Sequence, residues 1–108
     1  MQKIKSINPT VAHEWLSNHE AIVIDVREPS EYNEVHIPGA YLIPIGTIGI
    51  NKLPENAVNK KIIVHCKLGK RGSMACEKLL SENPNLHIYN IEGGIDAWEN
   101  AGLKVEKL

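Results

Sequence analysis

The sequence is poor in cysteine, and this scarcity excludes two common kinds of structural site. Its 108 residues include two cysteines, Cys66 and Cys76, which are too few for a disulfide scaffold. No C-x-x-C pair occurs and the five histidines are scattered, so we expect no zinc site and no other metal centre. The role of each thiol must then be inferred from its surroundings in the sequence.

Net charge and long apolar runs are also in short supply. The formal net charge is −1, without the basic excess or basic run that is typical of proteins that bind nucleic acid or anionic membranes. The longest apolar run, residues 21–24, is far shorter than the roughly 20 residues of a membrane span, and residues 1–5 lead into no signal segment. We therefore expect a cytoplasmic protein with no nucleic-acid partner and no membrane partner.

The hydrophobic pattern is that of an α/β protein folded as a single domain over residues 1–108. A chain of this length can bury a sizeable core as one domain. Segments rich in isoleucine and valine alternate with helical patterns, which is typical of a mostly parallel sheet. Strands are predicted at residues 3–7, 21–26, 61–65 and 86–91, with a further brief strand that ends near residue 43.

Helices are predicted between these strands. Asn8 supplies an N-cap and Pro9 the first helical position of a helix whose apolar face includes Trp15. A short polar helix is expected over about residues 27–35 and another short helix over 45–53. Residues 67–72 are predicted as a loop, ahead of a helix over 73–82 whose apolar face contains Cys76, and the last helix covers 95–100.

Cys66 stands at the carboxyl end of a predicted buried strand and is followed by a short loop and a helix. Ligands bind at this edge of open α/β sheets. The backbone N–H groups of such a loop can form an anion-binding nest, to which the positive end of the helix adds. Together with the cationic side chains of Lys67, Lys70 and Arg71, these donors favour the thiolate form of Cys66 and an anionic substrate over its sulfur.

Four ordered motifs resemble those of the rhodanese family of sulfurtransferases. Residues 65–71, HCKLGKR, are similar to the family's C-x-x-G-x-R active-site loop. The others are IDVRE at 24–28, EY at 31–32 with HIPGA at 36–40, and GGIDAW at 93–98 with AGL at 101–103. The resemblance extends over about residues 3–105. It implies a five-stranded parallel sheet in the order 1-5-4-2-3, flanked by helices on both faces.

The resemblance also implies thiosulfate sulfurtransferase activity through a persulfide on Cys66, without a cofactor. Thiosulfate, a small anionic donor, would give its outer sulfur to Cys66, and cyanide or a thiol such as that of thioredoxin or glutathione would accept it. We expect Asp25 and Arg27 to form a buried ion pair that braces this site, and Trp98 to pack in the core near the site wall. The expected substrate-binding loop consists of Lys67, Leu68, Gly69, Lys70, Arg71 and Gly72.

Two other functions remain open at this point. A rhodanese-like module could bind a partner protein, or shuttle sulfur to one, without catalysing the transfer itself. Cysteine phosphatases and arsenate reductases also place a His-Cys pair at a strand end and an arginine at the start of a helix. Their pattern has five residues between cysteine and arginine, whereas four lie between Cys66 and Arg71, and a shorter loop is poorly shaped for attack on phosphorus.

The chain departs from the family pattern inside the expected loop. Gly72 stands where many rhodaneses have serine or alanine, so we expect Ser73 to take over the capping of the following helix. Cys76 lies on the apolar face of that helix and is expected to be a packed core thiol. His65 alternates away from Cys66 along the strand, and we interpret it as a packing or hydrogen-bonding residue.

Overall fold

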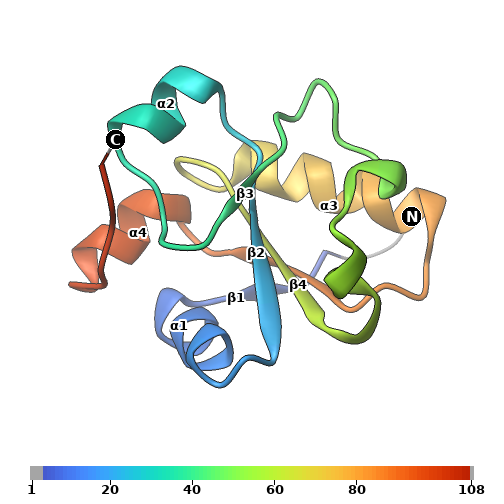
Figure 1. Cartoon of the computed structure of the whole chain (residues 1–108), viewed down its shortest axis with the longest axis horizontal. Helices are drawn as coiled ribbons and strands as arrows, with labels where there is room; N and C mark the ends of the chain where they lie inside the picture. Colours follow the sequence, from blue (N-terminus) through green and yellow to red (C-terminus); the bar gives the residue numbers. More distant parts are fainter. Residues whose placement is uncertain (1–3, 108) are drawn as a thin grey trace.

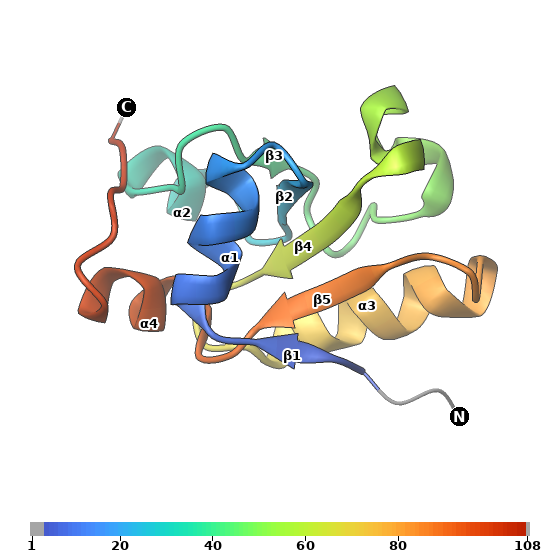
Figure 2. The same ribbon diagram turned by 90° about the horizontal axis from the view of Figure 1, so that it is seen from below.

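The computed structural model describes residues 4–107, and its centre is a sheet of five strands that are all parallel. The predicted strand order 1-5-4-2-3 is confirmed, and β1, β5 and β4 can be followed side by side in Figure 2. Residue 3, the expected start of the first strand, lies outside the described residues. In sheet order the strands are β1 (Ser6–Ile7), β5 (Ile88–Ile91), β4 (Lys61–His65), β2 (Ala21–Asp25) and β3 (Tyr41–Leu42).

Helices cover both faces of the sheet, as predicted (Figure 1). One face packs against α3 (Lys70–Glu82) and the two 3-10 turns, η1 (Ile50–Lys52) and η2 (Glu55–Asn59). The other packs against α1 (Pro9–Ser17) and α4 (Gly94–Asn100), with α2 (Pro29–Glu34) at its edge. The expected start of α1 is confirmed, because the Asn8 side chain accepts a hydrogen bond from the Val11 N–H at 2.9 Å and Pro9 is the first helical residue.

The two central strands are buried on both sides, which is why their sequences are apolar without interruption. In β2, Ile22 and Ile24 face the α3 layer, whereas Val23 faces the α1 and α4 layer. In β4, Val64 and Ile63 divide between the two layers in the same way. Side chains alternate across a strand, so each central strand contributes to both halves of the core.

The prediction of a helix over residues 45–53 is wrong. The chain makes a hydrogen-bonded turn in which the Thr47 N–H and hydroxyl both donate to the Pro44 carbonyl, at 2.8 and 3.0 Å. Gly49 is fully extended, with φ −174° and ψ 164°, and only the single turn η1 follows it. The two glycines of this segment weaken a helix enough for these local contacts to prevail.

No helix in the described part of the chain has the length and apolar character needed to cross a membrane.

Replacing Ile63 with alanine tests the two-sided core. Ile63 is fully buried at the centre of β4, so we expect Ile63→Ala to lower the free energy of unfolding by about 2–5 kcal/mol. Met74, which is 54% exposed on α3, is the matched control, and Met74→Ala should change it by less than about 0.5 kcal/mol. Urea unfolding followed by circular dichroism measures both, and equal effects would contradict the assignment of the core.

Candidate active site

Cys66 is the first residue after β4, at the carboxyl edge of the sheet and between the neighbouring strands β2 and β5. Its residue surface is 1% exposed, and its side chain belongs to the core cluster on the α3 side. Residues 67–69 then turn away from the sheet and α3 begins at Lys70. The structure thus places the thiol where the sequence predicted it, at the end of the strand and at the start of a short loop.

The start of α4 holds the first two peptide carbonyls after β4. The Ile95 N–H donates to the Cys66 carbonyl at 2.9 Å, and the Asp96 N–H donates to the Lys67 carbonyl at 3.2 Å. Gly94 permits this approach, because a Cβ built there would lie 2.3 Å from the Lys67 oxygen and 2.6 Å from the Cys66 oxygen. Its backbone φ of +62° also favours glycine, so the second glycine of the last motif has a structural cause.

Gly69 supplies the hydrogen bond that the sulfur accepts. Its backbone has φ +123°, a conformation that other residues rarely adopt, and its N–H lies 3.0 Å from Cys66 Sγ. On its other side, the Gly69 carbonyl accepts a hydrogen bond from Asn90 Nδ2 at 2.9 Å. A donor fixed at this distance stabilises a thiolate relative to a thiol, since the charged acceptor makes the stronger hydrogen bond.

The helix after the loop begins three residues earlier than the sequence predicted. Residues 67–72 were expected to be loop, but Lys70, Arg71 and Gly72 form the first turn of α3, with Gly69 as the N-cap. The Ser73 N–H donates to the Gly69 carbonyl at 3.0 Å, so Ser73 is inside the helix and does not cap it. The N–H groups of this first turn have no hydrogen-bond acceptor among the described residues, so they remain available to an anion.

Two of the three loop cations are already paired. Arg71 makes two hydrogen bonds to the Glu31 carboxylate, at 2.7 and 3.0 Å, and this contact lowers the pKa of Glu31 to about 2 and raises that of Arg71. Lys67 lies 3.2 Å from Asp96 at an exposed position. Lys70 has no ion pair within residues 4–107. The sequence alone did not reveal these partners, because both carboxylates are distant along the chain.

Asp25 and Arg27 form the expected buried ion pair. The guanidinium makes hydrogen bonds to both carboxylate oxygens, the shortest at 2.7 Å, and the two side chains are 0% and 3% exposed. Arg27 also donates to the Val35 carbonyl at 2.7 Å, at the end of α2. Its side chain therefore braces α2 rather than the Cys66 loop, which differs from the expectation.

His65 is a fully buried hydrogen-bonding residue, as expected. Its Nδ1 lies 3.1 Å from the Cys66 carbonyl, which can only accept, so Nδ1 carries the hydrogen. Its Nε2 lies 3.6 Å from Asp25 Oδ2 and has no hydrogen-bond partner among the described atoms. Burial lowers the pKa of His65, although the nearby Asp25 opposes this effect, so the neutral ring is favoured.

The remaining predicted residues divide between the core and the rim. Cys76 is fully buried on α3, and burial, followed by the proximity of Cys66, raises its pKa to about 12. Trp98 is 2% exposed and its Nε1 donates to the Lys104 carbonyl at 2.9 Å, so it packs in the core. Leu68 is 67% exposed at the tip of the loop.

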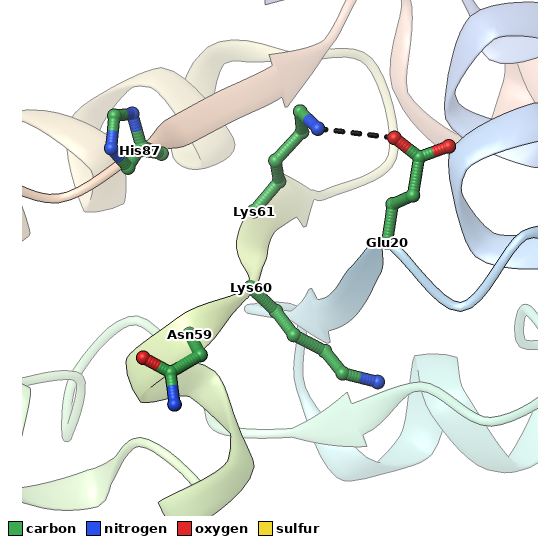
Figure 3. A pocket seen from close by; sticks show the side chains of 5 residues that line it. All are labelled: Glu20, Asn59, Lys60, Lys61 and His87. Carbon is green, nitrogen blue, oxygen red and sulfur yellow. Dashed lines mark hydrogen bonds and ion pairs between the residues drawn. The ribbon is translucent and has the colours of Figure 1, made fainter.

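Two hollows lie at opposite ends of the sheet. A cleft of about 240 Å³ adjoins the Cys66 loop between α2 and α4, with Arg27, Val35 and Ile95 in its lining. A hollow of about 430 Å³ lies at the amino ends of the central strands, between Lys61 and His87 (Figure 3).

In the part of the chain that the structure describes, no three His, Cys, Asp or Glu side chains gather as a metal site.

Asn90 is the site residue that the sequence analysis missed. It lies on β5, is 5% exposed, and is the partner of the Gly69 carbonyl. A polar amide within the otherwise apolar segment 88–91 was the available signal, because a buried polar side chain requires a hydrogen-bond partner.

Replacing Gly94 tests the contact between α4 and the loop. We expect Gly94→Ala to lower the free energy of unfolding by about 3 kcal/mol or more, because the new Cβ meets two backbone carbonyls. Gly102 is the matched control, since it has φ +78° but no atom near its Cβ position. Gly102→Ala should cost only the backbone strain, about 1 kcal/mol. Equal losses in urea unfolding would show that conformation alone requires Gly94.

The Arg71 and Glu31 pair predicts a specific pH dependence. A carboxyl group with a lowered pKa stabilises the folded state above its unfolded pKa, and this contribution is lost as the pH falls from about 4.5 towards 2. Glu31→Gln should therefore be less stable than the parent at pH 7, and the difference should shrink steadily below about pH 4.5. Urea midpoints measured across this range test it. Glu99 is exposed, and Glu99→Gln is the control. If the stability difference between Glu99→Gln and the parent also shrank below about pH 4.5, the effect could not be assigned to the pair of Glu31 and Arg71.

Comparison with known proteins agrees with this geometry. The family model described as "Rhodanese-like domain" matches residues 8–101. A solved structure of a rhodanese-related protein from Thermoplasma volcanium superimposes with a TM-score of 0.77 and 31% identity, over 94% of this chain and 97% of the other.

Two curated relatives are similar but longer. An uncharacterized protein of Synechocystis is 32% identical over 102 residues, which cover 94% of this chain and 56% of the relative. The "Probable adenylyltransferase/sulfurtransferase MoeZ" of Mycobacterium tuberculosis is 36% identical over 103 residues, which cover 89% of this chain and 25% of the relative. The chain therefore spans about half of one relative and a quarter of the other. By the family model and by the fold, this chain belongs to the rhodanese-like domain family.

Proposed function

We propose that the chain is a sulfurtransferase that carries sulfur as a persulfide on Cys66. The observation that carries the proposal is the hydrogen bond from the Gly69 N–H to Cys66 Sγ, at 3.0 Å. A buried structural cysteine needs no donor on its sulfur, whereas a nucleophilic thiolate and the persulfide formed on it both do. Thiosulfate is the donor that the anion-binding features favour.

The proposed reaction has two transfers. The Cys66 thiolate attacks the outer sulfur of thiosulfate, the S–S bond of thiosulfate breaks, and sulfite leaves with the bonding electron pair. Cys66 then carries the outer sulfur as a persulfide. Cyanide or an acceptor thiolate attacks this terminal sulfur, which departs as thiocyanate or as the acceptor's persulfide, and the Cys66 thiolate is restored. No cofactor is needed, because in each step the attacking nucleophile supplies the electron pair of the new bond and the leaving group keeps the pair of the broken bond.

Backbone N–H groups and Lys70 support binding of an anionic donor. The N–H groups of the first turn of α3 have no acceptor among the described residues and lie at the positive end of the helix. Lys70 adds a charge without an ion-pair partner in the described part of the chain. Lys67 and Arg71, which are paired, contribute less net charge than the sequence predicted. Binding of thiosulfate then depends mainly on the loop backbone.

The burial of Cys66 bears on the acceptor. With 1% of the residue exposed, a large acceptor cannot surround the sulfur. A persulfide carries the transferable sulfur about 2.05 Å farther from the chain than Sγ, where a thiol of glutathione or thioredoxin can reach it. A protein acceptor would rest on the exposed rim of the loop, which includes Leu68.

The alternatives receive less support from the geometry. A purely partner-binding module has no need for a donor held on the thiol. A phosphatase needs its arginine free for the phosphoryl oxygens, but Arg71 is held by Glu31 in a two-point contact. Incubation with thiosulfate discriminates among these functions.

Incubation with thiosulfate followed by mass spectrometry of the intact protein tests the proposal. We expect the mass to rise by one sulfur atom and to return to its starting value after cyanide is added. Cys66→Ser should abolish the increase, and Cys76→Ser, which removes the buried thiol, should leave it unchanged. An unchanged parent mass would overturn the proposal, and hydrolysis of an aryl phosphate would favour a phosphatase instead.

A further inference from the structure

Asn90 is held rigidly in the interior of the sheet. Its N–H donates to the Lys5 carbonyl at 2.9 Å, and it is in register with Ser6 of β1 on one side and Val64 of β4 on the other. With 5% of the residue exposed, the amide is directed into the protein. A side chain on such a backbone is a fixed point from which other groups can be positioned.

The Asn90 amide is connected to the thiol through a single residue. Its Nδ2 donates to the Gly69 carbonyl at 2.9 Å, and the Gly69 N–H donates to Cys66 Sγ at 3.0 Å. The orientation of the amide follows from this contact, because a carbonyl accepts and only the nitrogen can donate to it. Gly69 has φ +123°, a rarely populated backbone conformation, and the hydrogen bond from Asn90 stabilises it.

The other end of the amide faces the start of α3. Asn90 Oδ1 is buried and has no hydrogen-bond donor among the described atoms. A Cβ built on Gly72 would lie only 2.2 Å from this oxygen. The Cα hydrogen of Gly72 therefore points at Oδ1, which is the geometry of a weak C–H···O contact. Glycine at position 72 leaves the space that the amide occupies.

We infer that Asn90 is a positioning residue, which spans Gly69 and Gly72 and holds the N–H of Gly69 on the sulfur of Cys66. Its importance for sulfur transfer rests on the proposed function. Its effect on the thiol does not, because the hydrogen bonds exist whatever reaction Cys66 performs. The inference predicts both a change in the reactivity of Cys66 and an energetic coupling between positions 72 and 90.

The first test is the pH profile of alkylation by iodoacetamide, followed by mass spectrometry on the folded protein. Asn90→Ala should raise the midpoint for Cys66 alkylation by about one pH unit, because the Gly69 N–H that donates to the thiolate is no longer held in place. Asn90→Ser, whose hydroxyl is too short to replace the amide, should give a similar shift. Cys76 is fully buried, so its alkylation serves as an internal report of unfolding.

Ile88 provides the matched control. It lies two residues earlier on β5 and is 3% exposed, so Ile88→Ala loosens the same strand without touching the loop. We expect Ile88→Ala to lower the urea midpoint while leaving the pH midpoint for Cys66 unchanged. If Asn90→Ala and Ile88→Ala have the same pH midpoint as the parent, Asn90 is merely structural and the inference fails.

The second test is a double-mutant cycle in urea unfolding. Gly72→Ala alone should lower the urea midpoint, because its Cβ meets Asn90 Oδ1. In an Asn90→Ala background the same substitution should raise the midpoint, since alanine is the better helix former and the obstacle is gone. An effect of the same sign in both backgrounds would overturn the coupling. Neither test uses a sulfur donor, so their outcomes stay separate from a failure of the proposed function.

Discussion

Two backbone hydrogen bonds, from the N–H groups of Ile95 and Asp96 to the carbonyls of Cys66 and Lys67, fix the loop on which the candidate site depends. They exist because Gly94 lets the start of α4 reach the end of β4. With these carbonyls held, the chain turns sharply at Gly69 and directs an N–H at the sulfur. The thiol and its donor are therefore positioned by backbone hydrogen bonds, to which the Asn90 side chain adds its contact with the Gly69 carbonyl.

The sequence predicted that three cationic side chains surround the thiol, but two of them are paired with carboxylates. Arg71 is engaged with Glu31 and Lys67 with Asp96, so much of the cationic character of the loop is neutralised. Within residues 4–107, the groups of this site left without a partner, and so available to an anion, are the N–H groups at the start of α3 and the Lys70 ammonium. Fixed dipoles of this kind act on a small anion without the reorganisation that flexible side chains require. The buried pair of Asp25 and Arg27 holds the end of α2 through the hydrogen bond from Arg27 to the Val35 carbonyl.

Much of the fold followed from the sequence because its signals are local. The apolar runs of β2 and β4, the Asn-Pro start of α1 and the apolar stripe of α3 each express one periodicity, and the resemblance supplied the strand order. Two expectations failed for local reasons: the glycines of residues 45–53 favour the Thr47–Pro44 turn over a helix, and α3 begins early because Gly69 can act as its N-cap. Other contacts were missed because they join distant residues. The partnerships of Arg71 with Glu31 and of Gly69 with Asn90 join segments far apart in the chain.

The most direct test of the central claim, that Cys66 takes the outer sulfur of a small anionic donor, is a single turnover with isotopically labelled thiosulfate. Label in the outer sulfur should remain on the protein, at one atom per chain, and should leave as thiocyanate when cyanide is added. Label in the inner sulfur should appear only in free sulfite. Retention of the inner sulfur, or of neither, would contradict a persulfide on Cys66.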